Sequence, residues 1–252
     1  MSTPETEDAP TSESSSVFAD HVVLYLDFLG VSAAATSWPD DRAEKLIGAL
    51  RIVADARSRF DLDGASQSDG SFKFDVTAET STFSDHIVAS YLIYPGQQNL
   101  LNIVMGMYVS LARDMISKVA MLGLDVGLLV RGGLTIGKLY HYDGVVFGEA
   151  MIDAHLLESK VAVFPRIAVS PRIYESLSEA DQRKLLRQDS DGVWHLGYIS
   201  NMLENVPEAN RQRWVDSIIR MIDENIQAFE KAGKAKELSK WNWFKTEFLA
   251  VS

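Results

Sequence analysis

The pattern of apolar and polar positions predicts short strands and long helices along the first half of the chain. Residues 21–29, HVVLYLDFL, are rich in β-branched and aromatic side chains, which is typical of a buried strand. After Pro39, leucine and valine repeat at helical spacing, so residues 39–60 are predicted to form a helix. The further elements predicted in this half are a loop at 61–70, strands at 71–76 and 85–94, and a helix at 97–122 that ends at Gly123.

Glycines and a turn motif mark the next strands. A glycine-studded strand is predicted over 125–142, and Asp143-Gly144 predicts a hairpin whose return strand is 145–148. The remaining predictions are a helix at 148–161, a strand at 166–170, a helical segment at 171–188, a strand at 193–199 and a mostly helical region at 206–250. The order strand, helix, strand, strand, helix, strand is the split βαβ, ferredoxin-like arrangement. We therefore expect a mixed α/β (α+β) fold with helical additions at the C-terminus.

Composition divides the chain into three parts. Residues 1–18 are acidic and rich in Ser, Thr and Pro, with no basic and apolar leader pattern, so they are expected to form a disordered tail. Residues 19–205 are expected to form the main domain. Residues 206–252 are expected to form a helical extension packed on that core, and the Trp-rich segment KWNWFKTEF at 240–248 is interpreted as packing rather than as a ligand platform.

Charge and cysteine content exclude several classes of protein. The 252 residues carry a net charge of −11, which disfavours general binding to nucleic acid or to anionic lipid. The chain has no cysteine, so disulfides, thiolate metal sites and cysteine nucleophiles are excluded, which suits a cytoplasmic protein. The long apolar stretch at 99–124 is interrupted by Arg113, Asp114 and Lys118, so a buried helix is expected there and no membrane span.

One carboxylate stands inside the first predicted strand. Asp27 lies late in that strand, and Asp85 lies at the start of the third. These strands are antiparallel neighbours in the expected fold, so both carboxylates can meet at one edge of the sheet. Two close carboxylates repel each other unless a cation lies between them, and Mg²⁺ prefers carboxylates, water and phosphate oxygens. The alternative is that Asp27 is a solvated strand-end residue and Asp85 caps a turn.

Four short motifs follow one another along the predicted elements: DFLG at 27–30, FSD at 83–85, RGGLTIG at 131–137 and GEAMIDAHLLE at 148–158. Together they resemble the class III nucleotide cyclases over about residues 20–170. The resemblance implies that Asp27, Asp85 and the Phe28 carbonyl hold two divalent cations, Mn²⁺ or Mg²⁺. It also implies that the amides of Leu29 and Gly30 help to hold a triphosphate. Gly30 is equally compatible with a plain strand-to-helix turn. Arg131 is either a source of positive charge for the site or an ion-paired strand residue.

The departures from the family pattern concern purine recognition and the transition state. The family's Asn and Arg fall at Ile152 and Leu156, and polar purine-reading positions fall at Val145 and Ser81. This combination resembles the bacterial pyrimidine (uridylate or cytidylate) cyclases of Pycsar antiphage defence. The resemblance implies conversion of UTP, or of CTP, to the 3′,5′-cyclic monophosphate, which then activates a separate effector protein. It also implies a homodimer with composite active sites.

Two other functions stay open. The losses at Ile152 and Leu156 allow a degenerate cyclase fold that binds nucleotide or dimerises without turnover. A diguanylate cyclase is disfavoured because FSDH does not match the GGDEF-type hairpin motif. Lys160 and Arg166 are weaker candidates for phosphate binding from a partner subunit, and His141 and His155 are interpreted as surface or packed residues.

Overall fold

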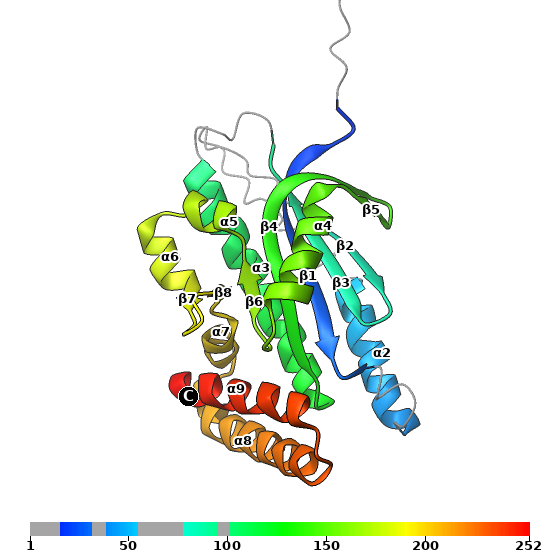
Figure 1. The fold of residues 1–252 in the computed structure, drawn as a ribbon, viewed down its shortest axis with the longest axis vertical. Helices are drawn as coiled ribbons and strands as arrows, with labels where there is room; N and C mark the ends of the chain where they lie inside the picture. The colour runs from blue at the N-terminus through cyan, green and yellow to red at the C-terminus, as the bar shows by residue number, and fades with distance from the viewer. Residues whose placement is uncertain (1–15, 32–38, 55–77, 95–100) are drawn as a thin grey trace, which may run out of the picture.

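A computed structural model describes residues 16–31, 39–54, 78–94 and 101–252 of the chain. The loop predicted at 61–70, the strand predicted at 71–76, most of the predicted tail, and the ends of two predicted helices (55–60 and 97–100) lie outside the described residues. The first half contains β1 (Ala19–Leu29), α2 (Asp40–Ala54), β2 (Ala78–Phe83), β3 (His86–Leu92), α3 (Leu101–Asp125) and β4 (Leu129–Tyr142). This order confirms the predicted strand, helix, strand, strand, helix, strand arrangement (Figure 1).

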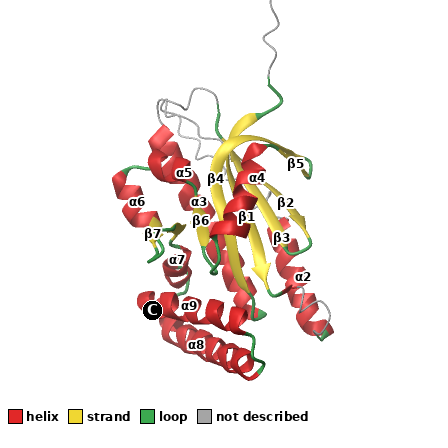
Figure 2. Cartoon of the chain, in the orientation of Figure 1, coloured by secondary structure: helices red, strands yellow, loops and turns green. Residues whose placement is uncertain are grey.

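In the described residues, the second half adds short strands, six further α-helices and one π-helix. The elements are β5 (Val145–Phe147), α4 (Glu149–Leu156), the π-helix η3 (Leu157–Val161), β6 (Ile167–Val169), α5 (Pro171–Ser176), α6 (Glu179–Leu185), β7 (Leu186–Gln188), β8 (Trp194–Leu196), α7 (Tyr198–Glu204), α8 (Glu208–Lys231) and α9 (Ala235–Val251). Figure 2 shows the strands as one sheet with α8 and α9 gathered at one end of it. No described helix is both long enough and apolar enough to cross a membrane.

The sheet has the strand order β2-β3-β1-β4-β6-β8-β7, and β5 pairs with β4 as a hairpin arm. Strand β1 is central and pairs antiparallel with both β3 and β4. Side chains alternate between the two faces of a strand, and β1 follows this rule. Its even positions pack in the core on the α3 side, and its odd positions Val23 and Tyr25 pack with Ala150 and Ala154 of α4. Asp27 is the next odd position, so it lies on the α4 side of the sheet.

Several predicted boundaries were wrong. The segment predicted as helical at 171–188 divides into α5, α6 and the strand β7. Residues 78–83, between the strands predicted at 71–76 and 85–94, form β2, the described partner of β3. The segment AETSTF lies at the edge of the sheet and has no regular alternation of apolar residues. Helix α3 continues past Gly123 to Asp125 and is followed by Gly127 at φ +71°. A Cβ on Gly123 would lie 3.0 Å from the Phe28 ring, so this glycine provides close packing rather than a helix end. The strand predicted at 193–199 is limited to residues 194–196, and Tyr198 begins α7.

The C-terminal helices share the main core. Trp241, Phe244 and Phe248 of α9 are buried in the same cluster as the α3 side of the sheet, which confirms the packing interpretation of the Trp-rich segment. Residues Ile218 and Ile222 of α8 belong to that cluster too. The division into a domain at 19–205 and an extension at 206–252 stays a prediction.

Candidate metal centre

The carboxylate of Asp27 lies at the end of the sheet where β1 terminates. Its residue is 7% exposed, and its register partners are His86 on β3 and Arg131 on β4. One strand therefore flanks Asp27 on each side, and each presents a polar side chain opposite it. A buried carboxylate is costly unless such neighbours or a cation neutralise its charge.

Asp85 lies in the two-residue turn between β2 and β3, rather than at the start of β3. Ser84 takes a positive φ of 55°, and its hydroxyl donates to Asp85 Oδ1 at 2.8 Å. The Phe28 N–H donates to the Asp85 carbonyl at 3.3 Å and ties the turn to the end of β1. The tight turn thus holds the Asp85 carboxylate against the neighbouring strand.

The structure brings the two aspartates together, as the topology predicted, and adds a histidine. One ligand atom from each of Asp27, Asp85 and His86 lies within 4.8 Å of the others. His86 Nδ1 is 3.3 Å from Asp85 Oδ1, and His86 Nε2 is 3.7 Å from Asp27 Oδ1. The sequence interpretation missed His86, although it directly follows the second aspartate of the motif.

Arg131 supplies the present counter-charge of Asp27. Its Nε donates to Asp27 Oδ2 at 3.0 Å, and its Nη2 is 2.6 Å from Glu158 Oε1. Arg131 is therefore ion-paired, which is one of the two alternatives left open by the sequence. The pair occupies one oxygen of Asp27, while Oδ1 faces His86.

Glu158 is the second buried acid of the site, and the sequence interpretation used it only as part of a motif. It is 2% exposed in η3, and His155 lies one turn before it with Nδ1 3.5 Å from Oε2. Burial raises the pKa of Glu158, while Arg131 acts against that rise. The sequence feature that could have indicated this pair is the spacing of His155 and Glu158 at i and i+3, which places both on one face of a helix.

The field in the site is negative. Tyr25 lies beside His86 and His155, with ring centroids 5.4 and 5.2 Å apart. Burial, followed by the charges of Glu158, Asp27 and Asp85, raises the pKa of Tyr25 to about 12. Such a field attracts cations to the cluster.

The predicted phosphate-binding backbone lies beside this cluster. An antiparallel residue directs its N–H and C=O toward the same neighbour, so the Phe28 carbonyl faces the side of the Asp85 turn. Leu29 remains paired with Leu129 in the β1–β4 ladder, so its amide lies in the sheet register rather than in an open loop. Gly30 follows with φ +102°, a conformation that favours glycine.

The donor set fits a divalent cation. Two carboxylates, the Phe28 carbonyl and an imidazole suit Mn²⁺, and the oxygens alone suit Mg²⁺. The atoms within 4.8 Å would hold one ion directly, and a second would depend on Phe28 and on substrate oxygens. These roles stay predictions.

The two positions that replace the family's Asn and Arg lie on exposed surface. Ile152 and Leu156 of α4 are 61% and 45% exposed. Arg166, one of the weaker phosphate candidates, is 1% exposed, and its guanidinium bonds to Asp189 and Asp191 at 2.6 and 2.5 Å. Arg166 is thus committed to a structural network.

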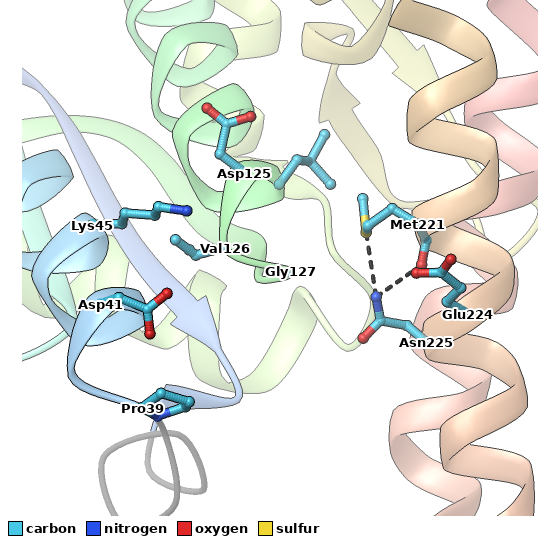
Figure 3. A pocket seen from close by; sticks show the side chains of 10 residues that line it. Pro39, Asp41, Lys45, Asp125, Val126, Gly127, Met221, Glu224 and Asn225 are labelled. Carbon is cyan, nitrogen blue, oxygen red and sulfur yellow. Dashed lines mark hydrogen bonds between the residues drawn. The ribbon is translucent and has the colours of Figure 1, made fainter.

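A separate pocket of about 470 Å³ lies between α2, the end of α3 and α8 (Figure 3). Asp41, Asp125 and Glu224 line it together with one cation, Lys45. Three carboxylates against one ammonium disfavour a triphosphate. The Asp27–Asp85 cluster is the better candidate for phosphate chemistry.

Comparison with known proteins found matches among solved structures, and one of them can be set beside this geometry. No family model matches the chain, and no curated protein matches it. The chain is similar to the crystal structure of the catalytic core of a rhodopsin-guanylyl cyclase with converted specificity in complex with ATPαS. The match has 12% identity and a TM-score of 0.38, and it covers 71% of this chain and 96% of the other. Because both values are low, nothing about the activity of this chain follows from the match.

Proposed function

We propose that this protein is a metal-dependent nucleotide cyclase that converts UTP to 3′,5′-cyclic UMP and pyrophosphate. The observation that carries the proposal is the convergence of Asp27 and Asp85, with His86, at the end of β1. The four motifs that resemble class III cyclases lie on the strands, the turn and the helix that surround this point.

The proposed reaction is an intramolecular displacement. The ribose 3′-oxygen forms a bond to the α-phosphorus and loses its proton, and the bond from that phosphorus to the β-phosphate oxygen breaks. Divalent cations held here would activate the 3′-hydroxyl and neutralise the leaving pyrophosphate. Asp27, Asp85 and the Phe28 carbonyl would bind these cations. The Gly30 backbone would contact the triphosphate, and the Leu29 amide would join it only on leaving its pairing with Leu129.

Arg131 has a second task in this proposal. Its guanidinium neutralises Asp27 at 3.0 Å in the described structure. When cations occupy the aspartates, Arg131 can turn part of its donor set to a phosphate oxygen, because a guanidinium presents several N–H groups in a fixed fork. Glu158 keeps the guanidinium at the site during this change.

The choice of a pyrimidine nucleotide rests on the resemblance. Ser81, at one purine-reading position, shares a hydrogen bond with His141 Nε2 at 2.9 Å. Val145, at the other, is an exposed residue of the hairpin arm. CTP is the alternative substrate. In the proposal, the cyclic nucleotide activates a separate effector during antiphage defence.

A homodimer with composite sites is also part of the proposal. The exposed apolar side chains Phe147, Ile152 and Leu156 lie on β5 and α4, on the side of the sheet that carries Asp27. Apolar groups of this kind support contact with a second copy.

A degenerate nucleotide-binding domain is the second candidate. It is favoured by one observation: Ile152 and Leu156 cannot hydrogen-bond a phosphate, and both side chains are solvent-exposed. The retained pair of aspartates argues against it.

The first test is an assay with four nucleotides. Purified protein is incubated with Mn²⁺ and each of ATP, GTP, CTP and UTP, and the products are resolved by chromatography against cyclic monophosphate standards. We expect cyclic UMP from UTP alone. A purine product would contradict the pyrimidine assignment, and no product from any of the four would favour the degenerate domain.

A further inference from the structure

We propose that Lys240 of α9 extends its ammonium group to the candidate metal centre and binds the β- and γ-phosphates of the nucleoside triphosphate. The inference rests on the proposed function and deepens it. It assigns to the C-terminal helix the positive charge that Ile152 and Leu156 cannot supply.

The neighbouring strands β4 and β6 begin at the same end of the sheet. Strand β6 runs parallel to β4 with Gly132 opposite Ile167, and Gly132 N donates to the Arg166 carbonyl at 3.1 Å. Arg131 and Arg166 directly precede these paired residues. The two arginines therefore mark the same end of two adjacent strands.

Helix α9 is attached to that edge through Trp243. Its indole N–H donates to Asp189 Oδ2 at 2.9 Å, and Arg166 Nη1 donates to the same oxygen at 2.6 Å. The indole also stacks on Phe164, with centroids 5.8 Å apart and planes 7° apart. The face of α9 that carries Trp243 thus contacts the segment leading into β6.

Arg166 links this contact to the acids of the site. Its Nη2 donates to the Val161 carbonyl, the last residue of η3, at 3.2 Å. Glu158 of the same π-helix pairs with Arg131. The chain of contacts from Trp243 to Arg131 is therefore continuous.

Lys240 precedes Trp243 by three residues and so lies one turn away on the same face of α9. Figure 1 shows α9 crossing the end of the sheet at which β1 terminates. Burial, then the charge of Arg131, lowers the pKa of Lys240, while Glu237 and Asp27 act in the opposite sense. Among the described residues no carboxylate lies within ion-pair distance of the ammonium.

A bound polyphosphate would neutralise the positive charges of Lys240 and Arg131. Lys240 and Arg131 repel each other, and a half-buried ammonium without a carboxylate is costly. An anion between them would accept charge-assisted hydrogen bonds from both. The triphosphate of the proposed substrate is such an anion.

The test measures binding of inorganic tripolyphosphate with Mg²⁺ by calorimetry. This probe cannot be cyclised and has no base, so it isolates the phosphate contacts. Lys240→Met should weaken binding about 10- to 100-fold, the usual effect of losing a hydrogen bond to a charged group. Lys240→Arg should stay within about threefold of the wild type. Lys231→Met removes an exposed lysine from the end of α8 and should leave the affinity unchanged.

Each outcome decides the inference separately from the cyclase assignment. Equal affinities for the wild type and Lys240→Met would overturn the role of Lys240, even in an active cyclase. Weakened binding in a protein that cyclises no nucleotide would support Lys240 and overturn the cyclase. Absence of tripolyphosphate binding by the wild type would overturn the inference as well. Lys240→Gln, which keeps a polar head, gives the same comparison should the methionine variant unfold.

Discussion

At the scale of single residues, the site is built around one buried carboxylate in the central strand. Asp27 is tolerated because Arg131 pairs with it across β1 and β4 at 3.0 Å. Removing one partner of a buried pair commonly costs roughly 3–5 kcal/mol, because the other charge is left without compensation. A cation bound by Asp27 and Asp85 can take over that compensation, so the same carboxylate serves stability and metal binding.

Glu158 makes a testable contribution to the pH dependence of stability. Its pKa is raised in the folded protein, chiefly by burial, above its ordinary value of 4.5. The folded state therefore holds this proton to higher pH than the unfolded state. The stabilisation is present below pH 4.5 and is lost as the pH rises through the folded-state value. We expect the free energy of unfolding to fall less, from pH 4.5 upward, in Glu158→Gln than in the wild type.

The measurement is urea unfolding without metal at several pH values. Glu149→Gln, which removes an exposed carboxylate at the start of α4, controls for the change in net charge. Parallel stability curves for Glu158→Gln and the wild type would show that Glu158 titrates alike in both states.

At the scale of elements, α9 is held by specific polar contacts as well as by its apolar face. Trp243→Phe keeps an aromatic ring beside Phe164, removes the hydrogen bond to Asp189, and also loses part of the ring surface that contacts His195. A hydrogen bond to a charged group contributes about 1.5–3 kcal/mol, so the variant should lose about that much stability in urea unfolding.

Lys236→Ala is the matched control for Trp243→Phe, because Lys236 is an exposed residue of the same helix. It should change the free energy of unfolding by less than about 0.5 kcal/mol. If both variants were equally stable, the Trp243–Asp189 contact would have no role in docking α9.

The glycines of β4 illustrate what an element's sequence can predict. Glycines in a strand allow another part of the backbone to approach closely, and a Cβ on Gly133 would lie 2.2 Å from the Ala154 carbonyl oxygen. The close approach of α4 to the sheet follows from that position. The π-helical turn that carries Glu158 could not be predicted, because it depends on how Arg166 holds the Val161 carbonyl.

At the scale of the whole molecule, the order of the elements was predictable because hydrophobic periodicity is local. The meeting of Asp27 and Asp85 followed from that order, since antiparallel neighbours bring one strand's end beside the next strand's beginning. His86 follows Asp85 directly and pairs with Asp27, so its place follows from the same strand order. Glu158 and Lys240 could not be placed in this way. Their positions depend on the docking of η3 and α9, which is set by contacts between residues far apart in the sequence.

The central claim is that Asp27 and Asp85 hold the cations for nucleotide cyclisation. The most direct measurement is Mn²⁺ binding by electron paramagnetic resonance in the wild type, Asp27→Asn and Asp85→Asn, followed by assay of each protein with UTP. Loss of an outer-shell partner already weakens metal binding about 10- to 100-fold, so loss of a ligand should cost at least as much.

We predict that both variants lose Mn²⁺ affinity and cyclic product together. Asp20 lies on the same strand as Asp27, and its exposed carboxylate pairs with Lys138 of β4. Asp20→Asn should retain both Mn²⁺ affinity and cyclic product. Variants that bind Mn²⁺ and cyclise UTP as the wild type does would contradict the account.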